Sequence, residues 1–203
     1  MADLTLKLSK EERRFQLFYD YLQELARPKE AKSNLISNKG EHHASILLGA
    51  LLDHTERNLR MYSTGLTPKL LHGYGDDCTA YWGVFQNFFD TKVPNFPDGS
   101  IKILVKTTDY QQFPPFQTVL LSSQHNPGKI EIKVQNEMSK NILDDYWGKD
   151  KKPIDFSVYD EIAYRLEYDP EQFKALASFH NKDISSELTS VFDNMFDVAS
   201  PFV

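Results

Sequence analysis

The sequence predicts an α/β fold, in which a mixed β-sheet with flanking helices follows one N-terminal helix. Two observations predict this fold. Between residues 42 and 134, segments with the apolar spacing of a helix alternate with segments typical of strands. Between residues 154 and 179, three strand patterns follow one another with short connections. The first pattern is typical of parallel strands with crossover helices, and the second of an antiparallel meander joined to them.

The N-terminal helix is predicted over about residues 9–26. Ser9 and Glu12 have the spacing of a capping box, and Pro28 ends the pattern. Apolar residues recur between them at helical spacing, with a second apolar line beside them: Phe15, Phe18, Leu22 and Leu25, then Leu17 and Tyr21. This broad apolar face either packs on the protein's own core or docks a partner or a second copy.

The chain divides into residues 1–40, the N-terminal helix and a linker, and residues 41–203, the α/β domain. The linker is polar except for Leu35 and Ile36, which fit a short strand. With 203 residues and 40% hydrophobic content, the chain is long enough to bury a sizeable core.

The α/β domain is expected to start with alternating elements. Helices are predicted over residues 42–57, 77–90 and 113–123, and strands over residues 58–63, 100–108 and 129–134. Ile46, Leu47, Ala50 and Leu51 share one face of the first helix, and Pro94 to Gly99 has turn composition. The segments IKILV and KIEIKV have the β-branched content and the alternation of strands.

The last third of the chain is predicted to contain strands over residues 154–159, 163–168 and 175–179. The first two flank Asp160 and Glu161 as the arms of a hairpin. A closing amphipathic helix follows, capped by Asn181 or Asp183. Its apolar face contains Ile184, Leu188, Val191, Phe192, Met195 and Phe196.

The order IKILV, KIEIKV, DFSVYDEIAYRLEYD and FKALASFHNKDISSELTSVFDNMF, within Glu41 to Phe196, resembles one half of the phospholipase D-like fold. In active members of that superfamily the hairpin carries His-x-Lys-x4-Asp, and two such motifs supply a nucleophilic histidine, a histidine acid and charge-stabilising lysines. In this sequence Asp155, Ser157 and Ile162 occupy the three positions. The resemblance therefore implies a single-copy, catalytically degenerate module that binds.

If a pocket persists at the ancestral site, we expect Asp155, Asp160, Arg165, Glu167 and His180 around it. Arg165 and Glu167 lie two residues apart on a strand and therefore share a face. They are predicted to form a cross-strand ion pair or to present polar groups to a ligand. The implied partner is a second copy or another protein, within a larger assembly such as a bacterial nucleic-acid-processing or defence system.

An enzyme is the alternative. His180, Lys182 and Glu187 have the spacing His-x-Lys-x4-Glu, which suits a metal-independent phosphodiesterase or nuclease if a dimer supplies the second copy. The same residues also suit the start of the closing helix. With one copy and this context, we take catalysis as the runner-up.

A third hypothesis is nucleic-acid or nucleotide binding. Asp144 to Gly148 reads as an exposed aromatic loop containing Trp147, beside a basic cluster of Lys149, Lys151 and Lys152. Aromatic rings beside lysines suit single strands. The alternative is a solvated connection with Trp147 packed against the core.

Composition limits the remaining classes. The net charge of −6 leaves no diffuse basic field for DNA or an anionic membrane. The histidines and carboxylates show no metal signature, so neither a metal nor a cofactor is expected. Cys78 is the only cysteine, which fits a reducing compartment. No export signal or membrane span is recognisable, and we expect a cytoplasmic protein.

Overall fold

The computed structural model describes residues 17, 19–23, 26, 35–38, 40–62, 66, 79–96, 100–149, 151 and 154–202, with residues 41, 42 and 79–82 described by their backbone alone. In this part of the chain the elements are β1 (Ile36–Asn38), α2 (Glu41–Asp53), β2 (Leu59–Tyr62), α3 (Thr79–Asn87), a π-helical turn (Phe88–Lys92), 3₁₀ turns (Val93–Asn95 and Thr108–Gln112) around β3 (Ile101–Val105), α4 (Pro114–His125), β4 (Ile130–Val134), α5 (Glu137–Trp147), β5 (Asp155–Tyr159), β6 (Ala163–Asp169), β7 (Lys174–Ser178), α6 (Lys182–Val198) and β8 (Ser200–Pro201).

The described strands form one eight-stranded sheet in the order β1-β7-β6-β5-β2-β3-β4-β8. Strands β2, β3 and β4 are parallel, and β5, β6 and β7 form an antiparallel meander that joins β2 through β5. This arrangement confirms the predicted mixed sheet. The edge strand β1 pairs with β7 and is the short strand expected in the linker, whereas β8, which pairs with β4, was not predicted.

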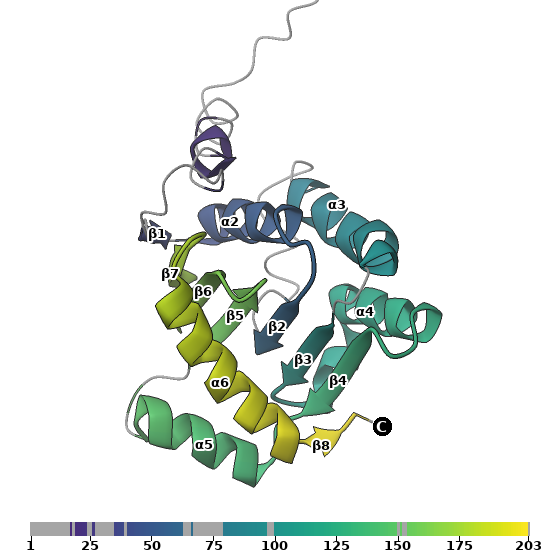
Figure 1. Ribbon diagram of the computed structural model, residues 1–203, viewed down its shortest axis with the longest axis vertical. Coiled ribbons are helices and arrows are strands. Elements are labelled where there is room, and N and C mark those ends of the chain that lie inside the picture. The colour runs from purple at the N-terminus through teal and green to yellow at the C-terminus, as the bar shows by residue number, and fades with distance from the viewer. Residues whose placement is uncertain are drawn as a thin grey trace, which may run out of the picture.

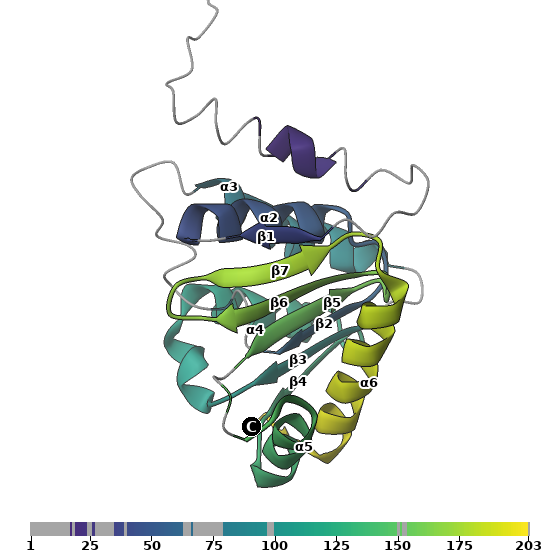
Figure 2. The same cartoon turned by 90° about the vertical axis from the view of Figure 1, so that its left-hand side faces the viewer.

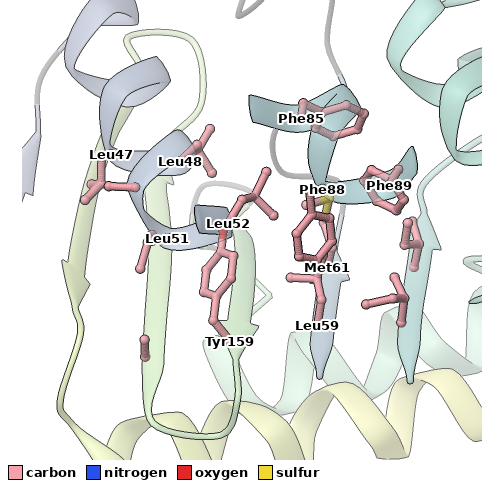
Figure 3. Packing of buried hydrophobic residues seen from close by; sticks show 14 of the residues in the cluster. Leu47, Leu48, Leu51, Leu52, Leu59, Met61, Phe85, Phe88, Phe89 and Tyr159 are labelled. Atoms are coloured by element: carbon pink, nitrogen blue, oxygen red, sulfur yellow. The ribbon is translucent and has the colours of Figure 1, made fainter. Parts of the chain in front are cut away.

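Helices cover both faces of the sheet, with α2, α3 and α4 on one side and α5 and α6 on the other (Figure 1). Figure 3 shows Phe88 of the π-helical turn over Met61 of β2, and Leu51 of α2 farther along the same face of the sheet. Figure 2 shows the sheet with α6 running alongside it. The apolar sides of these helices therefore pack against the sheet.

Strand β5 divides its side chains between the two layers. Phe156 and Val158 are buried in the cluster formed with α5 and α6. Tyr159 belongs to the opposite cluster, and Asp155 and Ser157 share its face because strand side chains alternate. All five residues of β5 are buried, so the polar ones need partners inside the protein.

The closing helix begins after Asn181, whose Oδ1 accepts a hydrogen bond from the Ile184 amide at 3.2 Å. Of the two expected caps, Asn181 is therefore the one used. The helix buries Leu188, Val191, Phe192, Met195 and Phe196 of the predicted apolar face, whereas Ile184 in its first turn is 38% exposed. Lys133 of β4 donates to the carbonyl of Phe196 at 2.8 Å, which fixes the far end of the helix on the sheet.

The prediction of an exposed loop over residues 144–148 is wrong. Asp144 to Trp147 form the last turn of α5, which ends at Gly148 with a φ of 102°. The helix begins at a capping box in which the side chains of Asn136 and Ser139 each accept a hydrogen bond from the other residue's amide.

The N-terminal helix contacts the main core. Residues 19–23 and 26 are helical, and Leu22 is fully buried in the cluster under α2. Gln23 lies 2.8 Å from the Nε2 of His54, just after α2. Leu17 and Tyr21 are 69% and 51% exposed, so the second apolar line remains open to solvent. Phe18 and Leu25 lie outside the described residues.

Candidate binding site

Three of the five expected site residues meet on one face of the sheet. Asp155 and Glu167 are directly opposite one another in the register of β5 and β6, and Arg165 is opposite Ser157. They lie on the face that α2 and α3 cover. Because β5 begins beside the end of β2, the Asp155–Glu167 pair is at the carboxyl end of the parallel strands. Open α/β sheets bind ligands at this edge.

Arg165 and Glu167 form a buried ion pair. The Nη2 of Arg165 donates to Oε1 of Glu167 at 2.8 Å, and the two side chains are 0% and 4% exposed. Both residues belong to β6, so the pair runs along one strand. The prediction of a cross-strand pair is therefore wrong. A pair this deeply buried loses two hydration shells, which the ion pair and further hydrogen bonds must offset.

Asp155 is held by a residue that the sequence analysis missed. Lys106, directly after β3, donates to Oδ1 of Asp155. Burial raises the pKa of Asp155 above its ordinary value, although the neighbouring Lys106 ammonium pulls in the opposite direction. The place of Lys106 after a parallel strand was the signal, since the carboxyl ends of such strands share one edge.

Ser157 and Ile162, which the sequence resemblance assigns to the other two positions of the motif, have different environments. The Ser157 hydroxyl is buried and shares a 2.8 Å hydrogen bond with the hydroxyl of Tyr159. Burial raises the pKa of Tyr159 to about 12, so this pair is neutral near pH 7. Ile162 is 44% exposed, beside the turn between β5 and β6. Neither residue offers an ionised group to a substrate.

Asp160 lies at the opposite end of the hairpin and supports the backbone. It occupies the β5–β6 turn with a φ of 48°. Its carboxylate accepts hydrogen bonds of 2.7 to 2.8 Å from the amides of Glu56, Arg57 and Asn58, which lead into β2. The structure therefore does not place Asp160 with Asp155 and Glu167.

His180 is at the same end as Asp160. It follows β7, and the amide of the next residue, Asn181, bonds the carbonyl of Ile162 in the turn region at 2.9 Å. The Nε2 of His180 lies 3.2 Å from the carbonyl of Ala26, which can only accept, so Nε2 carries the proton. The structure thus separates His180 from the Asp155 cluster along the length of the strands.

Lys182 and Glu187 do not converge with His180. Both are exposed residues of α6, and five helical positions place them on different sides of the helix. The Glu187 carboxylate instead lies near the Tyr146 hydroxyl of α5. The pKa of Tyr146 is raised to about 12, first by burial and then by Glu187.

The structure describes part of the predicted aromatic and basic cluster at the end of α5. Trp147 is half-buried against the core cluster of α6, and the Nζ of Lys151 lies 5.3 Å from the centre of its ring. This arrangement matches the alternative in which Trp147 packs against the core. Lys149 is exposed, and Lys152 is outside the described residues.

Among the described residues, no group of three or more His, Cys, Asp or Glu side chains is arranged to hold a metal ion. Within the same residues, no helix is both long enough and apolar enough to cross a membrane.

Comparison with known proteins supports the fold. No family model and no curated protein sequence matches the chain. Among solved structures, the phospholipase D family member Nuc from Salmonella typhimurium is similar with a TM-score of 0.54 and 9% identity, over 84% of this chain and 99% of that one. TrmBL2, an archaeal chromatin protein described with a novel mode of DNA binding, is similar with a TM-score of 0.55 and 9% identity, over 95% of this chain. This chain spans 62% of the length of TrmBL2. The chain therefore has an α/β fold that resembles a phospholipase D-like half.

Proposed function

We propose that the protein is a non-catalytic phospholipase D-like module that acts by binding a second copy or another protein. The observation that carries this proposal is the state of the hairpin. At the positions of the family's histidine and lysine, Asp155 is buried and bonded to Lys106, and Ser157 is buried and bonded to Tyr159. These buried contacts are typical of residues that stabilise the fold. They do not suit an attacking group, which needs a free lone pair and access to substrate.

The enzyme alternative is less favoured by the geometry. His180 is at the amino end of the parallel strands, and its Nε2 is engaged with Ala26. A nucleophile needs this nitrogen unprotonated and open. Lys182 and Glu187 point elsewhere, so a second copy would repeat the same separated groups.

Nucleic-acid binding is a second candidate, because the TrmBL2 likeness extends over 95% of this chain. Its electrostatic support is weak. Lys102, Lys129 and Lys133 make internal polar contacts, and Lys151 lies over Trp147. A labelled oligonucleotide whose binding weakens with salt and with Lys149→Glu plus Lys151→Glu would support this candidate.

Self-association is tested best at the open side of the N-terminal helix. Leu17 and Tyr21 are exposed and four residues apart, so they share a helix face. Leu22 is unsuitable for this test, since it is fully buried and its replacement would disturb the core.

Sedimentation of the wild type over a hundredfold concentration range should show a dimer or larger species, and Leu17→Asp with Tyr21→Ser should give a monomer. Leu121→Ser is the matched control, because Leu121 is 56% exposed on α4. A wild type that stays monomeric throughout would refute self-association. A double variant that associates as the wild type does would exclude this helix as the contact.

A further inference from the structure

A second group of exposed apolar side chains lies on α5 and α6, on the opposite face of the sheet from α2. Met138, Ile142 and Tyr146 are spaced four residues apart and therefore share one side of α5. Met138 is 63% and Tyr146 38% exposed, and Ile142 is partly buried against the core. Ile184, in the first turn of α6, is 38% exposed. We call these four residues the α5–α6 apolar surface.

Contacts between the two helices bring these residues together. The side-chain amide of Asn136, at the start of α5, donates to the carbonyl of Val198, at the end of α6, at 2.7 Å. At the other end of α5, the hydroxyl of Tyr146 contacts Glu187 of α6. The helices therefore run antiparallel. Ile184 precedes Glu187 by three residues, shares its side of α6 and lies near Tyr146.

Acidic side chains surround the α5–α6 apolar surface. Asp145, Asp183 and Glu187 are exposed. Asp145 follows Ile142 by three residues and Asp183 directly precedes Ile184, so both flank the apolar side chains. Among the described residues, none of the three carboxylates has an ion-pair partner. A complementary partner therefore presents apolar side chains together with positive charge.

The open side of the N-terminal helix has this chemistry. Leu17 and Tyr21 are 69% and 51% exposed, while the opposite side packs on the core. In the sequence, Lys10, Arg13 and Arg14 precede Leu17 at the spacing of one helix side. These three basic residues lie outside the described residues, and the predicted helix over residues 9–26 places them in line with Leu17. The open side is thus apolar at Leu17 and Tyr21 and basic toward its amino end.

The two surfaces of one chain lie too far apart to meet. Residues 19–23 lie beyond α2 at one end of the molecule, and α5 lies at the opposite end (Figure 1 and Figure 2). The N-terminal helix is also fixed to the core, because Gln23 contacts His54 at 2.8 Å and the carbonyl of Ala26 contacts His180 at 3.2 Å. A contact between the two surfaces therefore requires a second copy.

We propose that the open side of the N-terminal helix docks on the α5–α6 apolar surface of a second copy. This inference rests on the proposed self-association and names the surface that receives the helix. The two surfaces differ, so the contact is heterologous: one intact helix and one intact receiving surface form it completely.

The test compares two variants, alone and mixed, by sedimentation over the same hundredfold concentration range. The helix variant is Leu17→Asp with Tyr21→Ser. The surface variant is Met138→Lys with Asp145→Lys, which removes an exposed apolar group and reverses the charge that faces the helix. Each variant alone should self-associate at least about tenfold more weakly than the wild type. An equimolar mixture should form a complex, because one variant keeps the helix and the other keeps the receiving surface.

Leu121→Lys is the matched control, since Leu121 is 56% exposed on α4, on the other face of the sheet, and this variant should associate as the wild type does. If the surface variant does not fold, Ile184→Asp tests the same surface from α6.

A surface variant that associates as tightly as the wild type would overturn this inference and leave the proposed self-association intact. A mixture without any complex, while the wild type associates, would also overturn it. A wild type that stays monomeric would refute self-association itself.

Discussion

The buried pair of Arg165 and Glu167 allows a sharp prediction of stability. Glu167→Gln keeps the shape of the side chain but removes the charge that neutralises Arg165. Removing one partner of a buried ion pair costs about 3–5 kcal/mol, because the other charge is left uncompensated. Asp155, directly opposite Glu167, compensates part of the Arg165 charge. We therefore expect a loss near the lower limit, about 3 kcal/mol.

Glu161→Gln is the matched control. Glu161 also pairs with an arginine, Arg60, at 3.3 Å, but its side chain is 51% exposed. Exposed ion pairs contribute about 0.2–1 kcal/mol, so the free energy of unfolding of this variant should be close to that of the wild type. Urea denaturation of both variants under the same conditions gives the two losses.

A double variant separates the charge effect from packing. Arg165→Met with Glu167→Leu replaces the pair by apolar residues of similar volume, which is neutral or stabilising in comparable cases. We expect it to recover most of the stability that Glu167→Gln loses. A Glu167→Gln protein within about 1 kcal/mol of the wild type would refute the reasoning, because Arg165 would then not depend on its partner.

Two further predictions concern the supports of the sheet. Asp160→Ala removes the acceptor of three backbone amides and should lower the free energy of unfolding, measured in urea, by about 2–3 kcal/mol. Asp160→Asn keeps one acceptor oxygen and should lower it by less. Equal decreases in the two variants would contradict this role of Asp160. Burial alone would raise the pKa of Asp193, but Arg60 and Lys102 outweigh it and hold that pKa below its ordinary value. Its contribution is therefore present above the ordinary pKa and is lost as the pH falls through the lower, folded value. The wild type should exceed Asp193→Asn by about 1 kcal/mol at neutral pH and by less at low pH, and a pH-independent difference would contradict this assignment.

Local patterns were sufficient for most of the elements. The strand alternation in DFSVY and AYRLE and the apolar spacing of the closing helix are short-range features, and β5, β6 and α6 lie where these features predicted them. Helix α5 was missed because Asp144 to Trp147 suggested a loop. The capping pair of Asn136 and Ser139 was the local signal that the interpretation overlooked.

The composition of the site depended on long-range pairing. The side chains of Asp155 and Glu167 meet because of strand register, and Lys106 reaches Asp155 from a strand 49 residues earlier. From the sequence, Asp160 and His180 were expected around the same pocket as Asp155. The antiparallel meander instead places them at the other end of the hairpin. Sequence spacing indicates which residues share a face but not which end of a sheet they occupy.

Hydrolysis of bis(p-nitrophenyl) phosphate in the presence of EDTA decides whether the proposed module is non-catalytic, because active phospholipase D-like enzymes need no metal ion. We expect the wild type to hydrolyse the substrate no faster than the buffer blank, and His180→Ala to give the same rate. Turnover by the purified wild type that His180→Ala abolishes would contradict this expectation.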